Sequence, residues 1–153
     1  MINIQKATIV DAPVILEFIK KLAIYEKLEH QVSADLESIK NSFFGTNPRV
    51  FCLLAYWDSV PVGFAVYFYN YSTFLAKHGL YLEDLFIDPD YRSKGLGKAL
   101  LRALVQIAKD ENLGRVEWSV LDWNTPAIDF YKSLRARAMD EWTVYRITEE
   151  DFF

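Results

Sequence analysis

Apolar residues recur along this chain at two spacings, one typical of strands and the other typical of helices. Residues 2–6 predict a short first strand. Asp11, followed by Ala12-Pro13, predicts the start of a helix, since proline is favoured in the first helical turn. The apolar positions of this helix are Ile15, Phe18, Leu22 and Tyr25. A second helix is predicted to begin at a Ser33 cap and to end at Gly45.

The remainder of the chain also shows strand-like and helix-like patterns in turn. Aromatic and β-branched runs predict strands over 50–56, 62–69, 80–87, 116–121 and 142–147. One helix is predicted from the glycines at 95 and 97 to Gly114, and a short helix opens at 124–126. The order β-α-α-β-β-β-α-β-α-β predicts an α/β fold in which helices flank a mixed, mostly antiparallel central sheet. With 153 residues and no linker-like tract, we expect one domain over residues 1–153.

Composition and charge narrow the classes of partner. The hydrophobic fraction is 52% and the formal net charge is -4, which favours a folded chain and argues against binding nucleic acid or an anionic membrane by bulk electrostatics. A single cysteine, Cys52, predicts neither an internal disulfide nor a zinc site, so no metal is expected. No apolar run approaches the length of a membrane span, and no signal peptide opens the chain. We therefore expect a cytoplasmic protein.

Two glycines one residue apart mark the start of the helix that follows residues 80–87. The first turn of a helix carries unpaired N–H groups and a partial positive charge, which attract phosphate. Gly95 and Gly97 would let a diphosphate approach those N–H groups, with Arg92, Lys94 and Lys98 as nearby cations. A plain left-handed turn beside solvated lysines is the alternative. The spacing matches neither the dinucleotide-binding fingerprint nor the P-loop.

The spacing R-x-x-G-x-G, between a strand and a helix, resembles the acyl-CoA-binding motif of the GNAT superfamily of N-acetyltransferases. The blocks "LAIYEKLEHQV", "YLEDLFIDPDYRSKGLG" and "LDWNTPAIDFYK" look like those of its diamine (spermidine/spermine) and thialysine acetyltransferase branch, nearly end to end. This resemblance implies the GNAT fold, a homodimer and acetyl-CoA as co-substrate. The cofactor-binding residues that it implies are Leu85, Phe86, Ile87, Arg92, Ser93, Lys94, Gly95, Leu96, Gly97, Lys98, Asn124, Thr125, Pro126, Ala127 and Tyr131.

Acetyl transfer to an amine requires removal of a proton from the amine and benefits from donation of one to the departing thiolate. The resemblance implies that Tyr131 is the acid, and a phenol with a pKa of about 10 is a donor at neutral pH. It implies that Glu83 takes the proton of the amine. Because Glu83 and Asp84 are adjacent in a strand, we expect their side chains to point to opposite faces. Asn124 is also a candidate helix cap.

The acceptor amine is expected to meet acidic and aromatic side chains. The substrate-binding residues implied by the resemblance are Tyr25, Glu26, Glu83, Asp84, Glu117, Trp118, Ser119 and Trp142. Core packing is an equally open interpretation of Tyr25 and Trp142, and the favoured one for Trp118. At Tyr71-Ser72-Thr73-Phe74 the chain lacks an acidic residue of the diamine enzymes, which favours lysine-like acceptors over spermine. Arg135 replaces a usual glycine and must adopt a left-handed conformation or end its helix differently.

These patterns together predict an acetyl-CoA-dependent N-acetyltransferase acting on a primary amine of a small cationic molecule, either a diamine or polyamine or a lysine-like amino acid. Two alternatives remain open at this point. One is acetylation of a protein N-terminus or lysine, and the other is a non-catalytic CoA-binding sensor.

Overall fold

A five-stranded sheet organises the first part of the chain. The computed structural model describes residues 1–153, which form two compact units, 1–119 and 120–153. The sheet belongs to the first unit, and its strands lie in the order β1-β2-β3-β4-β5. The strands are β1 (Ile2–Lys6), β2 (Phe51–Trp57), β3 (Val60–Ser72), β4 (Lys77–Ile87) and β5 (Val116–Trp118). All neighbours are antiparallel except β4 and β5, which are parallel, so the predicted mixed sheet is confirmed.

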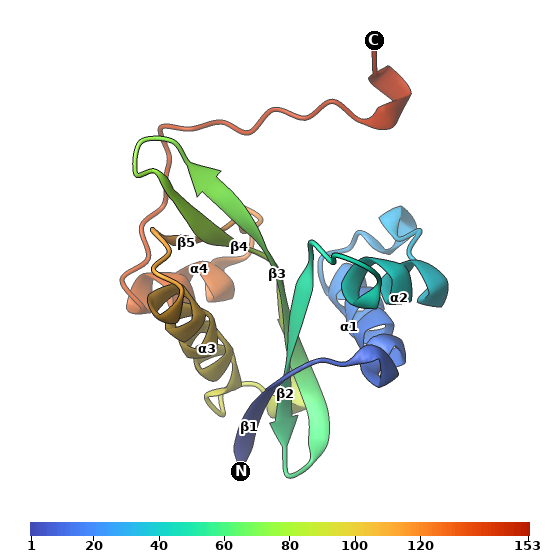
Figure 1. The fold of residues 1–153 in the computed structure, drawn as a ribbon. Helices are drawn as coiled ribbons and strands as arrows, with labels where there is room; N and C mark the ends of the chain where they lie inside the picture. Colours follow the sequence, from blue (N-terminus) through green and yellow to red (C-terminus); the bar gives the residue numbers. More distant parts are fainter. The chain divides into compact units, whose positions relative to one another are not determined.

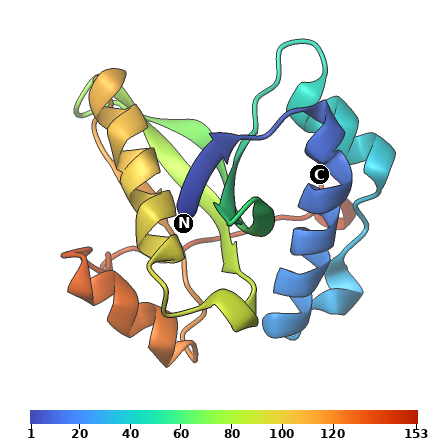
Figure 2. The same ribbon diagram turned by 90° about the horizontal axis from the view of Figure 1, so that it is seen from below.

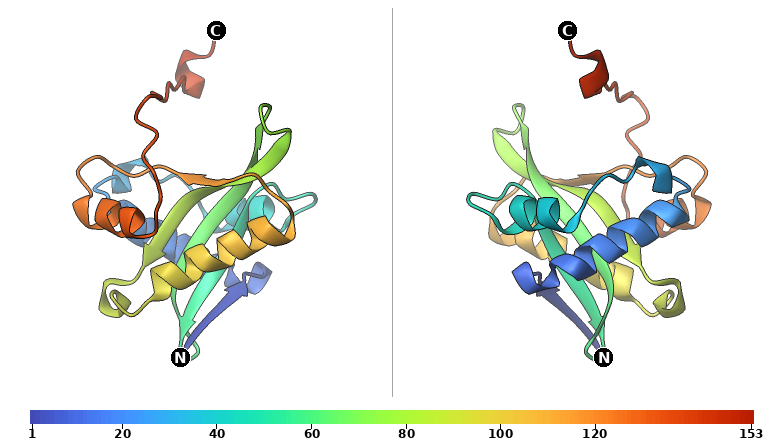
Figure 3. Two further views of the ribbon diagram at one scale, coloured as in Figure 1. Left: turned by 90° about the vertical axis from the view of Figure 1, so that its left-hand side faces the viewer. Right: turned by 90° about the vertical axis from the view of Figure 1, so that its right-hand side faces the viewer.

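Helices cover both faces of this sheet. Helices α1 (Ala12–Tyr25) and α2 (Leu36–Phe44) lie on one face, and α3 (Leu96–Asp110) lies on the other (Figures 1 and 3). Figure 2 shows the same two layers from below, with β1 as the edge strand of the sheet between them. Short 3-10 turns occupy Ile9–Asp11, Glu29–Gln31, Pro89–Tyr91 and Glu149–Asp151. None of the helices combines the length and the apolar character needed to cross a membrane.

The face of the sheet under α1 and α2 holds a hydrophobic core. Phe18 of α1 packs its ring 5.5 Å from Phe64 of β3 and 6.0 Å from Phe86 of β4. Phe64 and Ile15 are fully buried. Burial of each such side chain contributes about 1.5–3 kcal/mol, so this cluster fixes α1 against β4, the strand that carries the predicted site.

Helix ends follow the predictions only in part. Gly45 caps α2, as predicted, but the N-cap is Asp35 and not Ser33. Asp11 does stand at the N-cap of α1, yet its carboxylate accepts from the Thr8 N–H at 2.8 Å and makes no cap to the helix. Helix α3 ends at Asp110, before Gly114. These ends depend on which nearby backbone group each side chain reaches, and the local sequence leaves several choices open.

The second unit contains α4 (Thr125–Ser133) and an extended C-terminal segment. Arg135 adopts a φ of 68°, and the N–H of Ala136 bonds to the carbonyl of Tyr131 at 3.2 Å. This is the hydrogen bond of a left-handed helix end with a non-glycine residue at the left-handed position. The strand predicted over 142–147 is wrong, because the segment forms no strand. A strand needs a neighbouring partner, which an alternating pattern cannot supply.

Candidate functional site

The turn between β4 and α3 leaves the entrance of α3 open. Gly95 is the N-cap with a φ of 89°, Ser93 has a φ of 62°, and no side chain caps the first turn. Helix α2 differs, because Asp35 there accepts from the Ser38 N–H at 2.8 Å. Left-handed residues alternating with right-handed ones turn successive N–H groups toward one side, which creates an anion-binding concavity. The uncapped helix start and the left-handed φ angles of Ser93 and Gly95 are compatible with a phosphate cradle, which stays a prediction.

The predicted cofactor-binding residues between 92 and 98 differ in how far their side chains are exposed. The Leu96 side chain is 1% exposed and belongs to the core. Lys94 places its Nζ atom 5.4 Å from the centre of the Trp57 ring, and Lys98 is exposed. The left-handed φ is what favours glycine at position 95. Space does not, because a β-carbon there would meet only Cδ1 of Ile2, at an ordinary 3.8 Å.

A β-bulge in β4 brings the two predicted carboxylates together. Tyr67 of β3 pairs with Leu82 and Val66 pairs with Asp84, so Glu83 is an extra residue between the two pairs. The expectation that Glu83 and Asp84 point to opposite faces is wrong, because a bulge interrupts the alternation of a strand. Both interact electrostatically with Glu26 at the end of α1. The charge of Glu83 raises the pKa of Glu26, and the charge of Glu26 raises the pKa of Asp84.

These three carboxylates form an acidic cluster, defined here as Glu26, Glu83 and Asp84. Burial, followed by the charges of Glu83 and Glu26, raises the pKa of Asp84 to about 7. Burial and the charge of Glu83 also raise the pKa of Glu26. The charges that shift these pKa values are all negative. An ammonium group entering the cluster would relieve that repulsion, so the site favours a cationic ligand.

The strand β4 is left open on one side next to this cluster. Strand β5 pairs with β4 only from Leu80 to Leu82 and ends at Trp118. Residues 83–87 of β4 therefore have no strand partner on that side. Leu85, Phe86 and Ile87 lie in this open stretch, and the Phe86 side chain is buried in the core. Backbone groups on the open side of this stretch are what it can offer to a ligand, apart from the carbonyl oxygen of Ile87, which accepts from Arg92 Nε at 2.9 Å.

Strand β5 brings further predicted residues beside β4. Glu117 accepts from Arg115 Nε at 3.1 Å and from Asn70 Nδ2 at 3.2 Å, so it already has partners in the protein. The oxygen atoms of Ser119 and Tyr81 lie 2.7 Å apart. Tyr81 was missed by the sequence reasoning, since only the register of β4 against β5 places it there. Trp118 pairs with buried Leu82, in agreement with a packing role.

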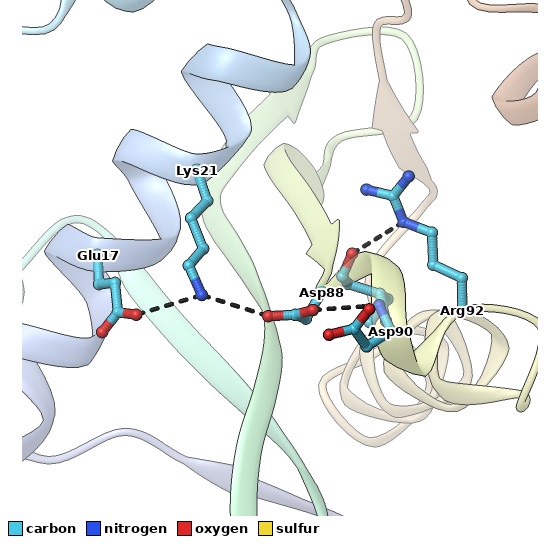
Figure 4. Close-up of polar contacts among 6 residues, drawn as sticks. Glu17, Lys21, Asp88, Asp90 and Arg92 are labelled. Atoms are coloured by element: carbon cyan, nitrogen blue, oxygen red, sulfur yellow. Dashed lines mark hydrogen bonds and ion pairs between the residues drawn. The ribbon is translucent and has the colours of Figure 1, made fainter.

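Two contacts join α1 to the turn after β4. Lys21 Nζ lies 3.2 Å from Asp88 Oδ2 and 3.2 Å from Glu17 Oε1 (Figure 4). Arg92 donates from Nε to the carbonyl oxygen of Ile87 at 2.9 Å, and its Cζ lies 4.7 Å from the centre of the Tyr25 ring. The side chain of Arg92 thus lies against the end of α1, and its predicted role beside the phosphates stays a prediction.

The remaining predicted residues belong to the second unit. Tyr131 lies on α4, with its ring centre 5.7 Å from that of Phe130. Asn124 occupies the N-cap position of α4 but makes no side-chain cap to it. Thr125, Pro126 and Ala127 form the first turn of the same helix, and Trp142 is exposed in the C-terminal segment. The predicted acid and the predicted base therefore belong to different units of the chain.

Comparison with known proteins identifies the family. The model of the acetyltransferase (GNAT) family matches residues 16–135, most of the chain. The chain belongs to the GNAT family of acetyltransferases. This N-acetyltransferase is 35% identical to the thialysine N-epsilon-acetyltransferase of Sus scrofa over 158 residues, which cover 96% of this chain and 92% of that one.

Two further comparisons bear on the branch and on the fold. The acetyltransferase is 48% identical to the L-ornithine N5-acetyltransferase of Arabidopsis thaliana over 91 residues, covering 60% of this chain and 40% of the plant protein. Among solved structures, an integron cassette protein of V. cholerae superposes with a TM-score of 0.81 at 24% identity, covering 98% of this chain and 94% of that one. The predicted GNAT fold and the resemblance to the thialysine branch are confirmed.

Proposed function

We propose that this N-acetyltransferase moves the acetyl group of acetyl-CoA to the side-chain amine of a small, lysine-like amino acid. One observation carries the proposal: the uncapped entrance of α3 stands at the end of the same strand whose bulge bears Glu83 and Asp84. In this proposal the turn binds the anionic diphosphate and the acidic cluster binds the cation, on either side of one open stretch of backbone. The donor carries a negatively charged diphosphate and the acceptor carries an ammonium group, so each is stabilised by an environment of the opposite charge.

Enzymes of this family use acetyl-CoA, and the residues present suit it. We assign the diphosphate to the N–H groups of residues 93–98, where the left-handed Ser93 and Gly95 expose the start of α3. The open edge of β4 at Leu85, Phe86 and Ile87 is assigned to the acyl arm. Acetyl-CoA supplies the acetyl group as a thioester. We assign Asn124, Thr125, Pro126 and Ala127 to it on the resemblance alone.

The acidic cluster is assigned to the acceptor. Glu83 is exposed at the bulge and is proposed to take the proton of the amine, directly or through water. Asp84 and Glu26 add negative potential that draws a cation in. Tyr131 is proposed to donate a proton to the departing thiolate. Its assignment is supported by the "NTPAIDFYK" block in which it stands.

The relatives favour an amino acid among the possible amines. One relative is named for thialysine and another for L-ornithine, both of which carry a side-chain amine and a carboxylate. The absence of an acidic residue at Tyr71-Ser72-Thr73-Phe74 points in the same direction, because it removes one anchor for a long polycation. Diamines remain the second candidate class.

We also propose that the enzyme is a homodimer. The C-terminal segment exposes seven large apolar side chains, which is more than isolated surface positions explain. They are Met139, Trp142, Val144, Tyr145, Ile147, Phe152 and Phe153. A second copy of the chain would cover them. The cytoplasmic location predicted from the sequence stays a prediction.

Thiol release from acetyl-CoA tests the proposed activity. The purified enzyme is assayed with thialysine, L-lysine, L-ornithine, putrescine, spermidine, an aminoglycoside and a peptide with a free N-terminus. We expect the highest kcat/KM with one of the amino acids. Turnover of the peptide alone would establish the protein-acetyltransferase alternative. Measurable acetyl-CoA affinity without turnover of any amine would instead establish the CoA-binding sensor.

A further inference from the structure

A lysine on α1 is bound to the residue that directly follows β4. Lys21 Nζ lies 3.2 Å from Asp88 Oδ2, although the two residues are 67 positions apart in the chain. The side chain of Asp88 is 23% exposed and that of Lys21 is 40% exposed, so water and salt screen this pair less than a pair that is fully at the surface. The ion pair is therefore a long-range contact that can hold the end of β4 against α1.

Both oxygen atoms of the Asp88 carboxylate are used. Oδ2 binds Lys21, whereas Oδ1 accepts from the Asp90 N–H at 3.2 Å (Figure 4). Asp88 is the N-cap of the 3-10 turn Pro89–Tyr91, and its carbonyl oxygen accepts from the Tyr91 N–H at 2.9 Å. The N–H of Asp88 itself donates to the carbonyl oxygen of Val62 on β3 at 2.8 Å. A single residue thus joins α1, β3 and the turn that leads to the entrance of α3.

Helix α1 offers a fixed attachment point for this contact. Ile15 and Phe18 of the same helix are buried in the core, and Lys21 Nζ lies 5.9 Å from the centre of the Phe18 ring. Glu17, one turn earlier, holds the same Nζ at 3.2 Å. The hydrogen bond to Glu17, and less strongly the one to Asp88, raises the pKa of Lys21, so the side chain stays an ammonium at neutral pH. The cation that meets Asp88 therefore occupies a defined place.

The turn after Asp88 leads to the N–H groups assigned to the diphosphate. The 3-10 turn ends at Tyr91, two residues before the segment 93–98. An anion that is bound by several N–H groups at once depends on their relative placement, because each hydrogen bond weakens steeply when its angle is distorted. Resting on the proposed function, we infer that Lys21 is a positioning residue for acetyl-CoA, which acts through Asp88 on the turn that presents residues 93–98 to the diphosphate.

The sign of one substitution separates this role from simple attraction of an anion by a lysine. If Lys21 acted on the diphosphate only through its charge, Asp88→Asn would remove a nearby negative charge and strengthen the binding of acetyl-CoA. If Lys21 acts through Asp88, the same substitution should weaken binding. Asparagine at position 88 keeps an oxygen that can accept from the Asp90 N–H and is itself a favoured N-cap, so mainly the ion pair is lost.

Calorimetric titration with acetyl-CoA in the absence of amine measures the effect on binding. Lys21→Met and Asp88→Asn should each raise the dissociation constant by about 3- to 10-fold, the effect of losing a partly buried ion pair. The double variant should be no worse than the weaker-binding single variant, because the two side chains act as a unit. Lys21→Arg should stay within about twofold of the parent, since a guanidinium group also pairs with a carboxylate. In steady-state kinetics, KM for acetyl-CoA should rise more than kcat falls.

Amide hydrogen exchange of the enzyme without ligand measures the position of the turn itself. Exchange of the amides of residues 90–95 should be faster in Lys21→Met and in Asp88→Asn than in the parent. Glu17→Gln and Lys20→Met are the matched controls and should behave like the parent in both measurements. The first removes the other partner of Lys21 and leaves the pair with Asp88 in place. The second removes an equal charge from an exposed position of α1.

The results that would overturn the inference differ from a failure of the proposed function. Tighter acetyl-CoA binding by Asp88→Asn, or equal weakening by Lys20→Met and Lys21→Met, would assign Lys21 a direct effect of charge. Faster exchange with an unchanged dissociation constant would show that the pair orders the turn without serving the cofactor. Asp88→Asn carries the same test should Lys21→Met fold poorly in denaturant unfolding. A parent enzyme without affinity for acetyl-CoA would overturn the proposed function and this inference together.

Discussion

Gly63 of β3 lies directly opposite Ile87 of β4, at the end of the strand that carries the candidate site. A β-carbon at residue 63 would stand 2.5 Å from the carbonyl oxygen of Phe86 and 2.5 Å from Cδ1 of Ile87. The first of these atoms belongs to the backbone and cannot turn aside. The missing side chain of Gly63 therefore sets where the last residues of β4 run, and these are the residues assigned to the acyl arm of acetyl-CoA.

Gly63→Ala should consequently cost both stability and cofactor affinity. We expect the free energy of unfolding to fall by about 1–3 kcal/mol, because β3 and β4 must separate to admit the methyl group. Denaturant unfolding and acetyl-CoA titration measure the two effects. Gly114→Ala is the matched control, since its β-carbon would meet chiefly the flexible end of Leu75, at 2.9 Å. Equal effects of the two substitutions would contradict the role assigned to Gly63.

The pKa of Asp84 predicts a specific dependence of stability on pH. Its folded-state pKa of about 7 lies above the ordinary value of 3.8. Between these two pH values the folded protein therefore holds a proton on Asp84 that the unfolded chain releases. Stability is thus lost as pH rises from about 4 to 7, and the loss stays constant above that range. Asp84→Asn should remove it, raising the free energy of unfolding at pH 8 by up to about 4 kcal/mol.

The corresponding measurement is denaturant unfolding of the parent and Asp84→Asn at several pH values from 4 to 8. The two proteins should differ little at pH 4 and progressively more toward pH 8. A variant that is less stable than the parent at pH 8, or a difference that does not change with pH, would show that Asp84 is not buried against its neighbouring carboxylates. Asp90→Asn, on the 3-10 turn, provides a control.

Arg135 predicts a stabilising substitution at the end of α4. Its φ of 68° is unfavourable for any residue with a β-carbon. Arg135→Gly should raise the thermal midpoint, with a gain of about 1 kcal/mol in the free energy of unfolding. Arg135→Ala removes the same charge but keeps the β-carbon, so it should bring no gain. A stabilisation by alanine equal to that by glycine would attribute the effect to charge instead.

Tyr131 predicts a loss of turnover without a loss of binding. Tyr131→Phe removes only the hydroxyl, so kcat should fall by about 100-fold, the usual contribution of a positioned acid. The acetyl-CoA dissociation constant should stay within about twofold of the parent value, because the proposed proton transfer acts in the transition state. Steady-state kinetics and calorimetry report the two quantities. Tyr71→Phe, which keeps the ring that packs on His78, is the control. Equal rates for Tyr131→Phe and the parent would remove Tyr131 from the mechanism.

The sequence by itself determined the order of the elements and the motif at the start of α3. Alternating and helical periods are local properties, so β1 to β4 and the four α-helices were predicted within a few residues of their observed bounds. The glycine spacing after β4 was equally local. It located the open helix entrance, and Gly95 does adopt the left-handed conformation that only glycine takes readily.

Only the tertiary structure decided how the acceptor residues are arranged. The bulge at Glu83 and Asp84 arises from the register of β3 against β4. The contact of Arg92 with Tyr25 joins residues 67 positions apart. The segment 142–147 carries a strand pattern yet forms no strand. In each case the outcome depends on whether a partner far along the sequence is in place, because pairing and stacking energies belong to two surfaces, and a local pattern describes only one of them.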